Sequence, residues 1–145
     1  MANFPTLRGR RNTSEAEICY LFGYNGEGSE ILAGTPVCWS DSALDGRTFE
    51  KPVTANFNLV AGIAEVAVGT AGYTNRIVAY GPVTTRTYGV ATTFVPGANL
   101  QLITAKDYVA YGSAMLVTSQ PRVFAALDTH STADTLSQSV FVRAL

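Results

Sequence analysis

The polar segment at residues 128–131 is the one place where the residue types of a nucleophilic catalyst lie next to one another. It contains Asp128, His130 and Ser131. On a strand, Asp128 and His130 would share one face and Ser131 would point to the other. A working triad needs the histidine between the nucleophile and the acid in space, which neighbouring residues rarely achieve. We therefore interpret this segment as a polar loop.

The other titratable residues also lack the spacing of an active site or a metal site. No two acidic residues are placed by sequence to act across a sugar, as a glycosidase requires. The chain has one histidine and no cysteine pair at CxxC spacing, so metal ligands are too few. We expect no catalytic residue, no cofactor and no metal, and a protein that is not an enzyme. The acidic residues that fall in expected turns or near strand ends are Glu15, Glu17, Glu27, Glu30, Asp41 and Asp45.

Several tyrosines could form a stacking platform for single-stranded nucleic acid. The arginines among them are only Arg76 and Arg86, and the net charge is −1, whereas such platforms normally lie in a positively charged groove. Packing or interface roles are therefore favoured, and we expect no direct nucleic-acid partner. The tyrosines in question are Tyr73, Tyr80, Tyr88, Tyr108 and Tyr111.

Hydropathy, the N-terminal segment and the cysteines indicate the compartment in which the protein works. No apolar run approaches the roughly 20 residues of a membrane helix, so we expect no membrane partner. The basic cluster near the N-terminus follows its few apolar residues, which is the reverse of a secretory signal. We expect the protein to stay where it is made or to be packaged from there. Cys19 and Cys38 lie in apolar runs, which favours two reduced, half-buried thiols over a disulfide.

Turn residues and apolar alternation predict an all-β domain of about nine short strands, a compact β-barrel or sandwich. The central pair is residues 63–68 and 76–80, joined by the glycine-rich turn at 69–72 and ended by a break at Gly81-Pro82. Residues 48–54 are expected to form an edge strand because Pro52 lacks an N–H group. Residues 128–138 are expected to be a loop, with Leu136 on a single helical turn.

The first fourteen residues differ from the rest, which we assign to one domain at residues 15–145. They show almost no periodicity and predict an extended N-terminal arm at residues 1–14. A frayed terminus is equally compatible with this composition. As an arm, the segment offers two apolar anchors and three cations to a partner: Phe4, Leu7, Arg8, Arg10 and Arg11.

Charged residues are unusually sparse. They make up 14% of the chain, against about 25% in typical soluble proteins. An isolated monomer has little reason to carry such a surface. Burial of part of it against other chains is the simplest explanation.

The order of segments resembles that of tailed-phage capsid decoration proteins, also called cement proteins. The resemblance covers roughly residues 32–145, through LAGTPV, LVAGIAEVAVGTAG, RIVAYGPV, PGANLQL, RVFAAL and VFVRAL. It implies a compact β-barrel or β-tulip-like domain, often a homotrimer, made in the host cytoplasm and bound to the outer surface of the capsid. It also implies a site at or near local three-fold axes, where N-terminal arms can pair with the major capsid protein and stabilise the head.

One alternative is a tail or baseplate domain, or a receptor- or glycan-binding module. An exposed Trp39 and the tyrosines would then form the binding face. The sequence also leaves open whether residues 18–24, from Ile18 to Tyr24, belong to the barrel or pair with a partner's sheet.

Overall fold

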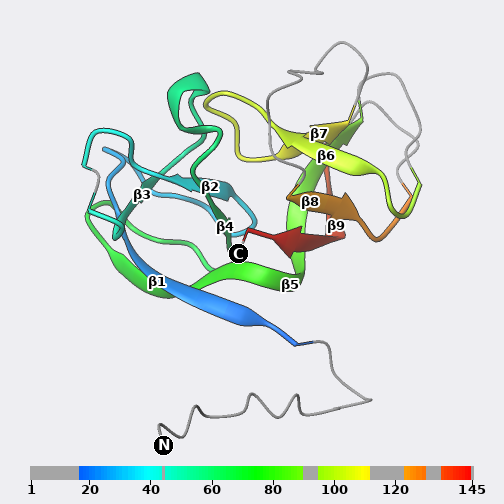
Figure 1. Ribbon diagram of the computed structural model, residues 1–145, viewed down its shortest axis with the longest axis horizontal. Coiled ribbons are helices and arrows are strands. Elements are labelled where there is room, and N and C mark those ends of the chain that lie inside the picture. The colour runs from blue at the N-terminus through cyan, green and yellow to red at the C-terminus, as the bar shows by residue number, and fades with distance from the viewer. Residues whose placement is uncertain (1–16, 44, 90–94, 112–122, 130–134, 145) are drawn as a thin grey trace, which may run out of the picture.

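The computed structural model describes residues 17–43, 45–89, 95–111, 123–129 and 135–144 (Figure 1). The described part is almost entirely β-structure, which confirms the predicted fold class. One 3-10 turn, η1 (Thr54–Asn56), lies between the third and fourth strands. The nine strands of the described part are β1 (Cys19–Asn25), β2 (Pro36–Trp39), β3 (Thr48–Glu50), β4 (Val60–Ala64), β5 (Tyr73–Gly89), β6 (Asn99–Leu102), β7 (Val109–Tyr111), β8 (Phe124–Ala126) and β9 (Thr135–Arg143).

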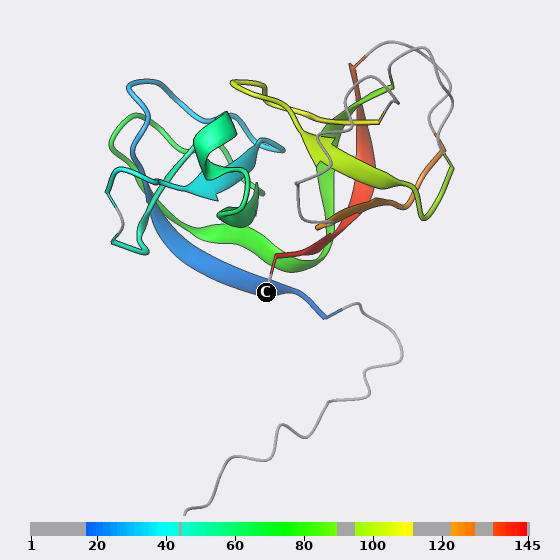
Figure 2. The same cartoon turned by 45° about the horizontal axis from the view of Figure 1, so that its top comes forward.

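The long strand β5 is shared by two hydrogen-bonded rings of strands. The first ring runs β1–β3–β2–β4–β5 and closes through antiparallel pairing of β1 with β5. The second runs β5–β7–β6–β8–β9 and closes through antiparallel pairing of β5 with β9. Figures 1 and 2 show the rings as two lobes on either half of β5. Closure leaves few free strand edges, which suits strands this short.

Two clusters of buried side chains fill this arrangement. The smaller lies within the first ring, and the larger extends from that ring into the second. Strand β4 is buried along its whole length because Ala61 faces the smaller cluster and Ile63 the larger. The smaller cluster is Ile31, Val37, Phe49, Ala61, Ala64, Val68 and Ile77. The larger cluster is Cys38, Phe57, Val60, Ile63, Val78, Val83, Leu100, Leu102, Val109, Phe124, Ala126, Val140 and Val142.

The expected break at Gly81-Pro82 is wrong, because β5 continues through both residues. Gly81 pairs with Val142 and Pro82 with Phe141, so β9 holds the strand together at this point. Gly81 has a φ of 114°. A Cβ at this position would lie only 2.5 Å from the carbonyl oxygen of Glu17. The glycine therefore lets β5 pass from one ring to the other while the start of β1 packs against it.

The predicted edge strand at residues 48–54 is also wrong. The strand is shorter, Thr48–Glu50, and pairs with β1 on one side and β2 on the other. Pro52 follows the end of β3, so it removes no donor from the ladder. The central pair is also displaced: β4 ends at Ala64, and Val68 forms only an isolated bridge with Ile31.

The loop predicted at residues 128–138 is too long. Strand β9 begins at Thr135, and Leu136 pairs with Thr87 instead of lying on a helical turn. Cross-strand pairing with β5 overrides the polar composition of this stretch. The Asp128 carboxylate accepts a hydrogen bond from the backbone N–H of Ser139 at 2.8 Å, while His130 and Ser131 lie outside the described residues.

Residues 18–24 belong to the barrel, because β1 pairs in parallel with β3 and antiparallel with β5. The predicted arm at residues 1–14 precedes this strand and lies outside the described residues. Within the described part of the chain, no helix has the length and apolarity needed to span a membrane.

Candidate functional site

The five residues predicted to contact a partner, Phe4, Leu7, Arg8, Arg10 and Arg11, all lie outside the described residues. The described surface is therefore the place to look for a site. Strand β1, which follows the predicted arm, exposes two large aromatic side chains, Tyr20 and Phe22.

Strand β1 divides its side chains between the core and the surface. Leu21 packs against the smaller buried cluster, while Tyr20 and Phe22 are exposed. A Cβ at position 23 would lie 2.5 Å from a ring carbon of Phe49, which is fully buried. Glycine at position 23 thus allows β1 to lie directly on the core, and the alternation of the strand directs the intervening aromatic side chains outward.

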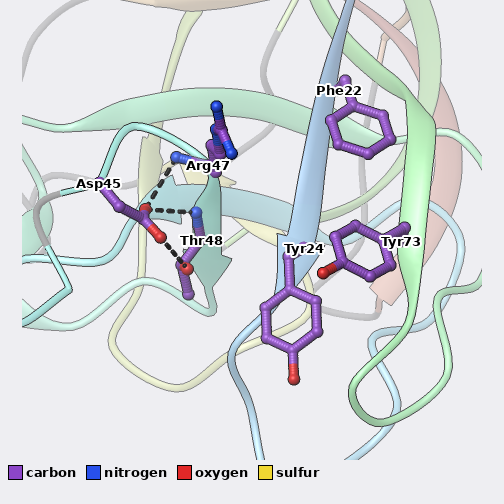
Figure 3. Close-up of a pocket in the computed structure, with 6 residues that line it drawn as sticks. All are labelled: Phe22, Tyr24, Asp45, Arg47, Thr48 and Tyr73. Carbon is purple, nitrogen blue, oxygen red and sulfur yellow. Dashed lines mark hydrogen bonds between the residues drawn. The ribbon is translucent and has the colours of Figure 1, made fainter.

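Phe22 and Tyr73 form an aromatic platform between β1 and β5. Their ring centroids are 5.6 Å apart and their planes differ by 15°. Figure 3 shows the rings next to one another on the two strands, with Tyr24 beside Tyr73. The Tyr24 ring lies 4.9 Å from that of Tyr73 and is tilted by 53°. Because Phe22 is 57% exposed and Tyr73 68% exposed, much of their ring surface remains open to solvent.

A polar loop completes a pocket beside these rings (Figure 3). The pocket has a volume of about 540 Å³, within the range of small-molecule sites. The loop is held by Asp45, whose carboxylate accepts hydrogen bonds at 2.8 Å from the backbone N–H groups of Arg47 and Thr48 and from the Thr48 hydroxyl. We call this the aromatic pocket; its lining residues are Phe22, Tyr24, Asp45, Arg47, Thr48 and Tyr73.

These hydrogen bonds keep Asp45 ionised. The backbone N–H of Thr48, then that of Arg47 and then the Thr48 hydroxyl lower the pKa of Asp45 to about 2, because each stabilises the carboxylate form. The carboxylate is therefore a permanent acceptor at neutral pH. Part of its lone-pair capacity remains available to a ligand.

Arg47 is the cation of the pocket. The ion pairs found among the described residues are Arg76 with Glu65 and Arg86 with Asp107, so the Arg47 guanidinium has no carboxylate partner there. Its backbone carbonyl accepts a 2.7 Å hydrogen bond from the N–H of Tyr24, which ties the loop to β1. One guanidinium and one carboxylate thus line the pocket, and their charges sum to zero.

Asn25 positions the other wall of the pocket. Its buried side-chain amide donates to the carbonyls of Val68 and Gly69, at 3.1 Å and 3.0 Å. Its backbone N–H donates to the carbonyl of Gly72 at 2.8 Å. These bonds fix the turn that leads into Tyr73, so the end of β1 determines where the Tyr73 ring lies.

A second group of exposed side chains lies where the N-terminal segment joins the barrel. Ile18 precedes β1, Tyr20 lies within it, and Tyr80 pairs in register with Cys19. We call Ile18, Tyr20 and Tyr80 the junction surface. The Tyr80 ring meets Phe141 edge-on at 5.2 Å, which links this surface to the second ring. At the border of this surface, the Tyr20 hydroxyl donates a hydrogen bond to the Glu65 carboxylate at 3.5 Å.

The cysteines are not part of a site. Both are free thiols in the structure, with Cys19 half-buried and Cys38 fully buried, the latter deeper than the sequence suggested. Burial raises the pKa of the Cys38 thiol to about 12, and the Glu50 carboxylate adds to this shift. Among the described residues, no group of three or more histidine, cysteine, aspartate or glutamate side chains is placed to hold a metal ion.

The expectation of an exposed Trp39 is wrong. This residue is partly buried and packs against the smaller cluster, because β2 directs it toward the same side as Val37. Sequence reasoning found the tyrosines but not the aromatic pocket. Residues 17–24 have the side-chain alternation of a strand, and Asp45-Gly46 is a typical turn dipeptide, yet nothing local places that turn beside Tyr73.

Comparison with protein-family models finds no match to this chain, and comparison with curated proteins finds none either.

Proposed function

We propose that the protein is a capsid decoration protein that binds the outer surface of a phage head and bridges neighbouring capsomers. The segment order described above motivates the proposal. A compact β-barrel is the fold that such a role implies, and the described chain has that fold. The partners in this proposal are the major capsid protein and further copies of the chain itself.

The observation that carries the proposal is the junction surface. Ile18, Tyr20 and Tyr80 expose apolar area where residues 1–16 join β1. An arm that pairs with a capsid strand would bring this surface against the shell. Apolar burial of about 25 cal/mol per Å² would then add to main-chain pairing. The residues just before β1 can bear such a contact, because Glu17 and Ile18 pack closely against Gly81 of β5.

Stabilisation of the head would follow from mass action. A protein that binds only the assembled shell stabilises it by RT ln(1 + [L]/Kd), about 4 kcal/mol per site at a thousand-fold excess over Kd. Many copies, each joining neighbouring capsomers, would oppose the outward pressure of packaged DNA.

Co-sedimentation with purified shells of the phage that encodes the protein tests the proposal. The full chain should sediment with expanded shells and remain in the supernatant with unexpanded ones. Deletion of residues 1–14 should sharply weaken this binding, and the melting temperature of the free protein should stay nearly unchanged because all of the described strands lie at Cys19 or later. Absence of binding to either shell would overturn the assignment.

A matched pair of substitutions tests the junction surface itself. Ile18→Asp should weaken shell binding by at least about tenfold, because a charge would be placed in an apolar contact. Leu127→Asp is the control: Leu127 is 41% exposed, similar to Ile18 at 38%, but lies after β8 in the second ring. Equal binding by the two variants would show that the junction surface does not face the shell.

A further inference from the structure

The aromatic pocket has the chemistry of a ligand site that decoration of a shell does not require. Phe22 and Tyr73 together expose apolar ring area beside a charged loop, and a contiguous exposed apolar patch bordered by polar residues is typical of a binding site. Phe22 and Tyr73 are held in this arrangement from two different strands, and the Asn25 bonds fix the turn beneath Tyr73. The pocket is therefore preorganised, which lowers the entropic cost of binding.

The polar wall of the pocket indicates what kind of group would lie on the rings. The Asp45 carboxylate accepts and the Arg47 guanidinium donates, while the hydroxyls of Tyr24 and Tyr73 can do either. A ligand that matches them must carry both donors and acceptors. Neighbouring hydroxyl groups on a sugar ring satisfy this requirement, because each hydroxyl both donates and accepts.

The charges of the pocket favour a neutral sugar over anionic ligands that could also stack on the rings. A nucleic acid would bring phosphates next to Asp45, and it would need a track of cations, whereas Arg47 is the one cation among the described residues that line this pocket. An acidic saccharide would meet the same carboxylate. A neutral pyranose avoids this repulsion, and its apolar C–H face can stack on the rings.

We propose that the aromatic pocket binds a neutral hexose unit of a glycan. The sugar face lies on the Phe22–Tyr73 platform, and adjacent hydroxyls hydrogen-bond to the Asp45 carboxylate and the Arg47 guanidinium. On a decorated head, this pocket would serve to attach the particle to saccharides. Phe22 and Tyr24 lie further along β1 than Ile18 and Tyr20, and Tyr20 and Phe22 are exposed on the same side of the strand, so the pocket adjoins the junction surface.

An array of neutral oligosaccharides of glucose, galactose, mannose and N-acetylglucosamine, with sialylated and uronic-acid glycans alongside, tests the proposal. The full-length protein should bind at least one neutral oligosaccharide, and titration calorimetry with that compound should give a dissociation constant of millimolar or tighter. Binding confined to acidic glycans, or to a single-stranded oligonucleotide included in the titrations, would overturn the proposal. No binding at all would also overturn it.

Substitutions locate the site. Tyr73→Ala and Phe22→Ala should each weaken binding at least tenfold, since each removes half of the platform. Tyr80→Ala is the matched control, because it truncates an exposed tyrosine of the same strand that does not line the pocket. Both Phe22 and Tyr73 are largely exposed, so their variants should remain folded, as circular dichroism would verify. Unchanged affinity in Tyr73→Ala would place any sugar binding elsewhere.

The same proteins separate this inference from the proposed function. Tyr73→Ala should still sediment with expanded shells, and the chain that lacks residues 1–14 should still bind the oligosaccharide. If the wild-type protein binds shells but no sugar, only the pocket assignment is overturned, and if it binds the sugar but no shell, only the decoration role is overturned.

Discussion

The ring of Phe22 lies 5.6 Å from that of Tyr73, with the two planes only 15° apart. The first residue lies on β1 and the second begins β5, and these strands pair antiparallel to close the first ring. The platform therefore exists only when the barrel is closed. A change in the Phe22–Tyr73 geometry would therefore indicate that the pairing of β1 with β5 is disturbed, as well as the pocket.

Gly62 is the position where we expect substitution to be most damaging. It has a φ of 146°, and a Cβ there would lie 2.1 Å from the backbone carbonyl oxygen of Val78. Gly62→Ala should therefore lower the free energy of unfolding by about 3 kcal/mol or more, through backbone strain and overpacking between β4 and β5. Gly28→Ala is the control, because nothing lies within 4 Å of its Cβ position. Urea denaturation of both variants gives the comparison, and equal stability would contradict the close approach of β4 to β5.

Asn25 should matter for both stability and the pocket. Asn25→Ala removes the buried donors to Val68 and Gly69. We expect a loss of about 2 kcal/mol in unfolding free energy, because the amide hydrogen bonds are lost and the Glu27 N–H loses the Asn25 side-chain oxygen as its acceptor. The Tyr73 ring resonances should also shift in NMR spectra. The exposed Asn75 provides a control substitution to alanine that should change stability by less than about 0.5 kcal/mol, and a similar loss in both variants would refute the positioning role.

Cys38 should make the folded state less stable at high pH. Burial raises the pKa of its thiol from 9.0 to about 12. As pH rises, the unfolded chain loses this thiol proton before the folded chain does. The stability that the protonated thiol gives the folded state is therefore complete below pH 9 and is lost as pH rises toward about 12. Denaturation at several alkaline pH values measures how the unfolding free energy falls as pH rises. This fall should be shallower for Cys38→Ala than for the wild type or Cys19→Ala. An equal fall of the unfolding free energy in all three proteins would show that the Cys38 thiol does not cause the loss of stability at high pH.

Asp45 should titrate far below an ordinary aspartate. Its hydrogen bonds lower its pKa from 3.8 to about 2. The stability that it contributes is therefore present above pH 3.8 and is lost as pH falls toward 2. Carboxyl NMR titration should give the low value in the wild type and a higher one in Thr48→Val, which removes the hydroxyl donor. Thr54→Val, outside the loop, should leave the titration of Asp45 unchanged; an ordinary value in the wild type would show that the loop is not formed.

We expect the protein to form a homotrimer, in solution or on the shell. Only 14% of its residues are charged, which is too few for a well-solvated isolated surface. Analytical ultracentrifugation of the free protein and the symmetry of the bound density would test this. A monomer under both conditions would rule the trimer out.

The sequence by itself determined the fold class. Alternating β-branched and aromatic residues favour extended backbone, and glycine-containing turns interrupt them, so an all-β chain of about nine strands follows from local preferences alone. In residues 17–24, the period-2 geometry of a strand puts Tyr20 and Phe22 on one side and Leu21 on the other. These features depend on neighbours in the chain, which is why they could be predicted.

Only the tertiary structure decided how the strands meet. Gly81-Pro82 is locally a break, yet pairing with Val142 and Phe141 keeps β5 continuous and lets it serve two rings. Trp39 is locally a candidate for recognition, yet the orientation of β2 packs it against the core. The aromatic pocket combines β1, the Asp45 loop and the start of β5, which are distant in sequence. Local composition cannot encode these contacts, because they arise from pairing and close packing between distant segments.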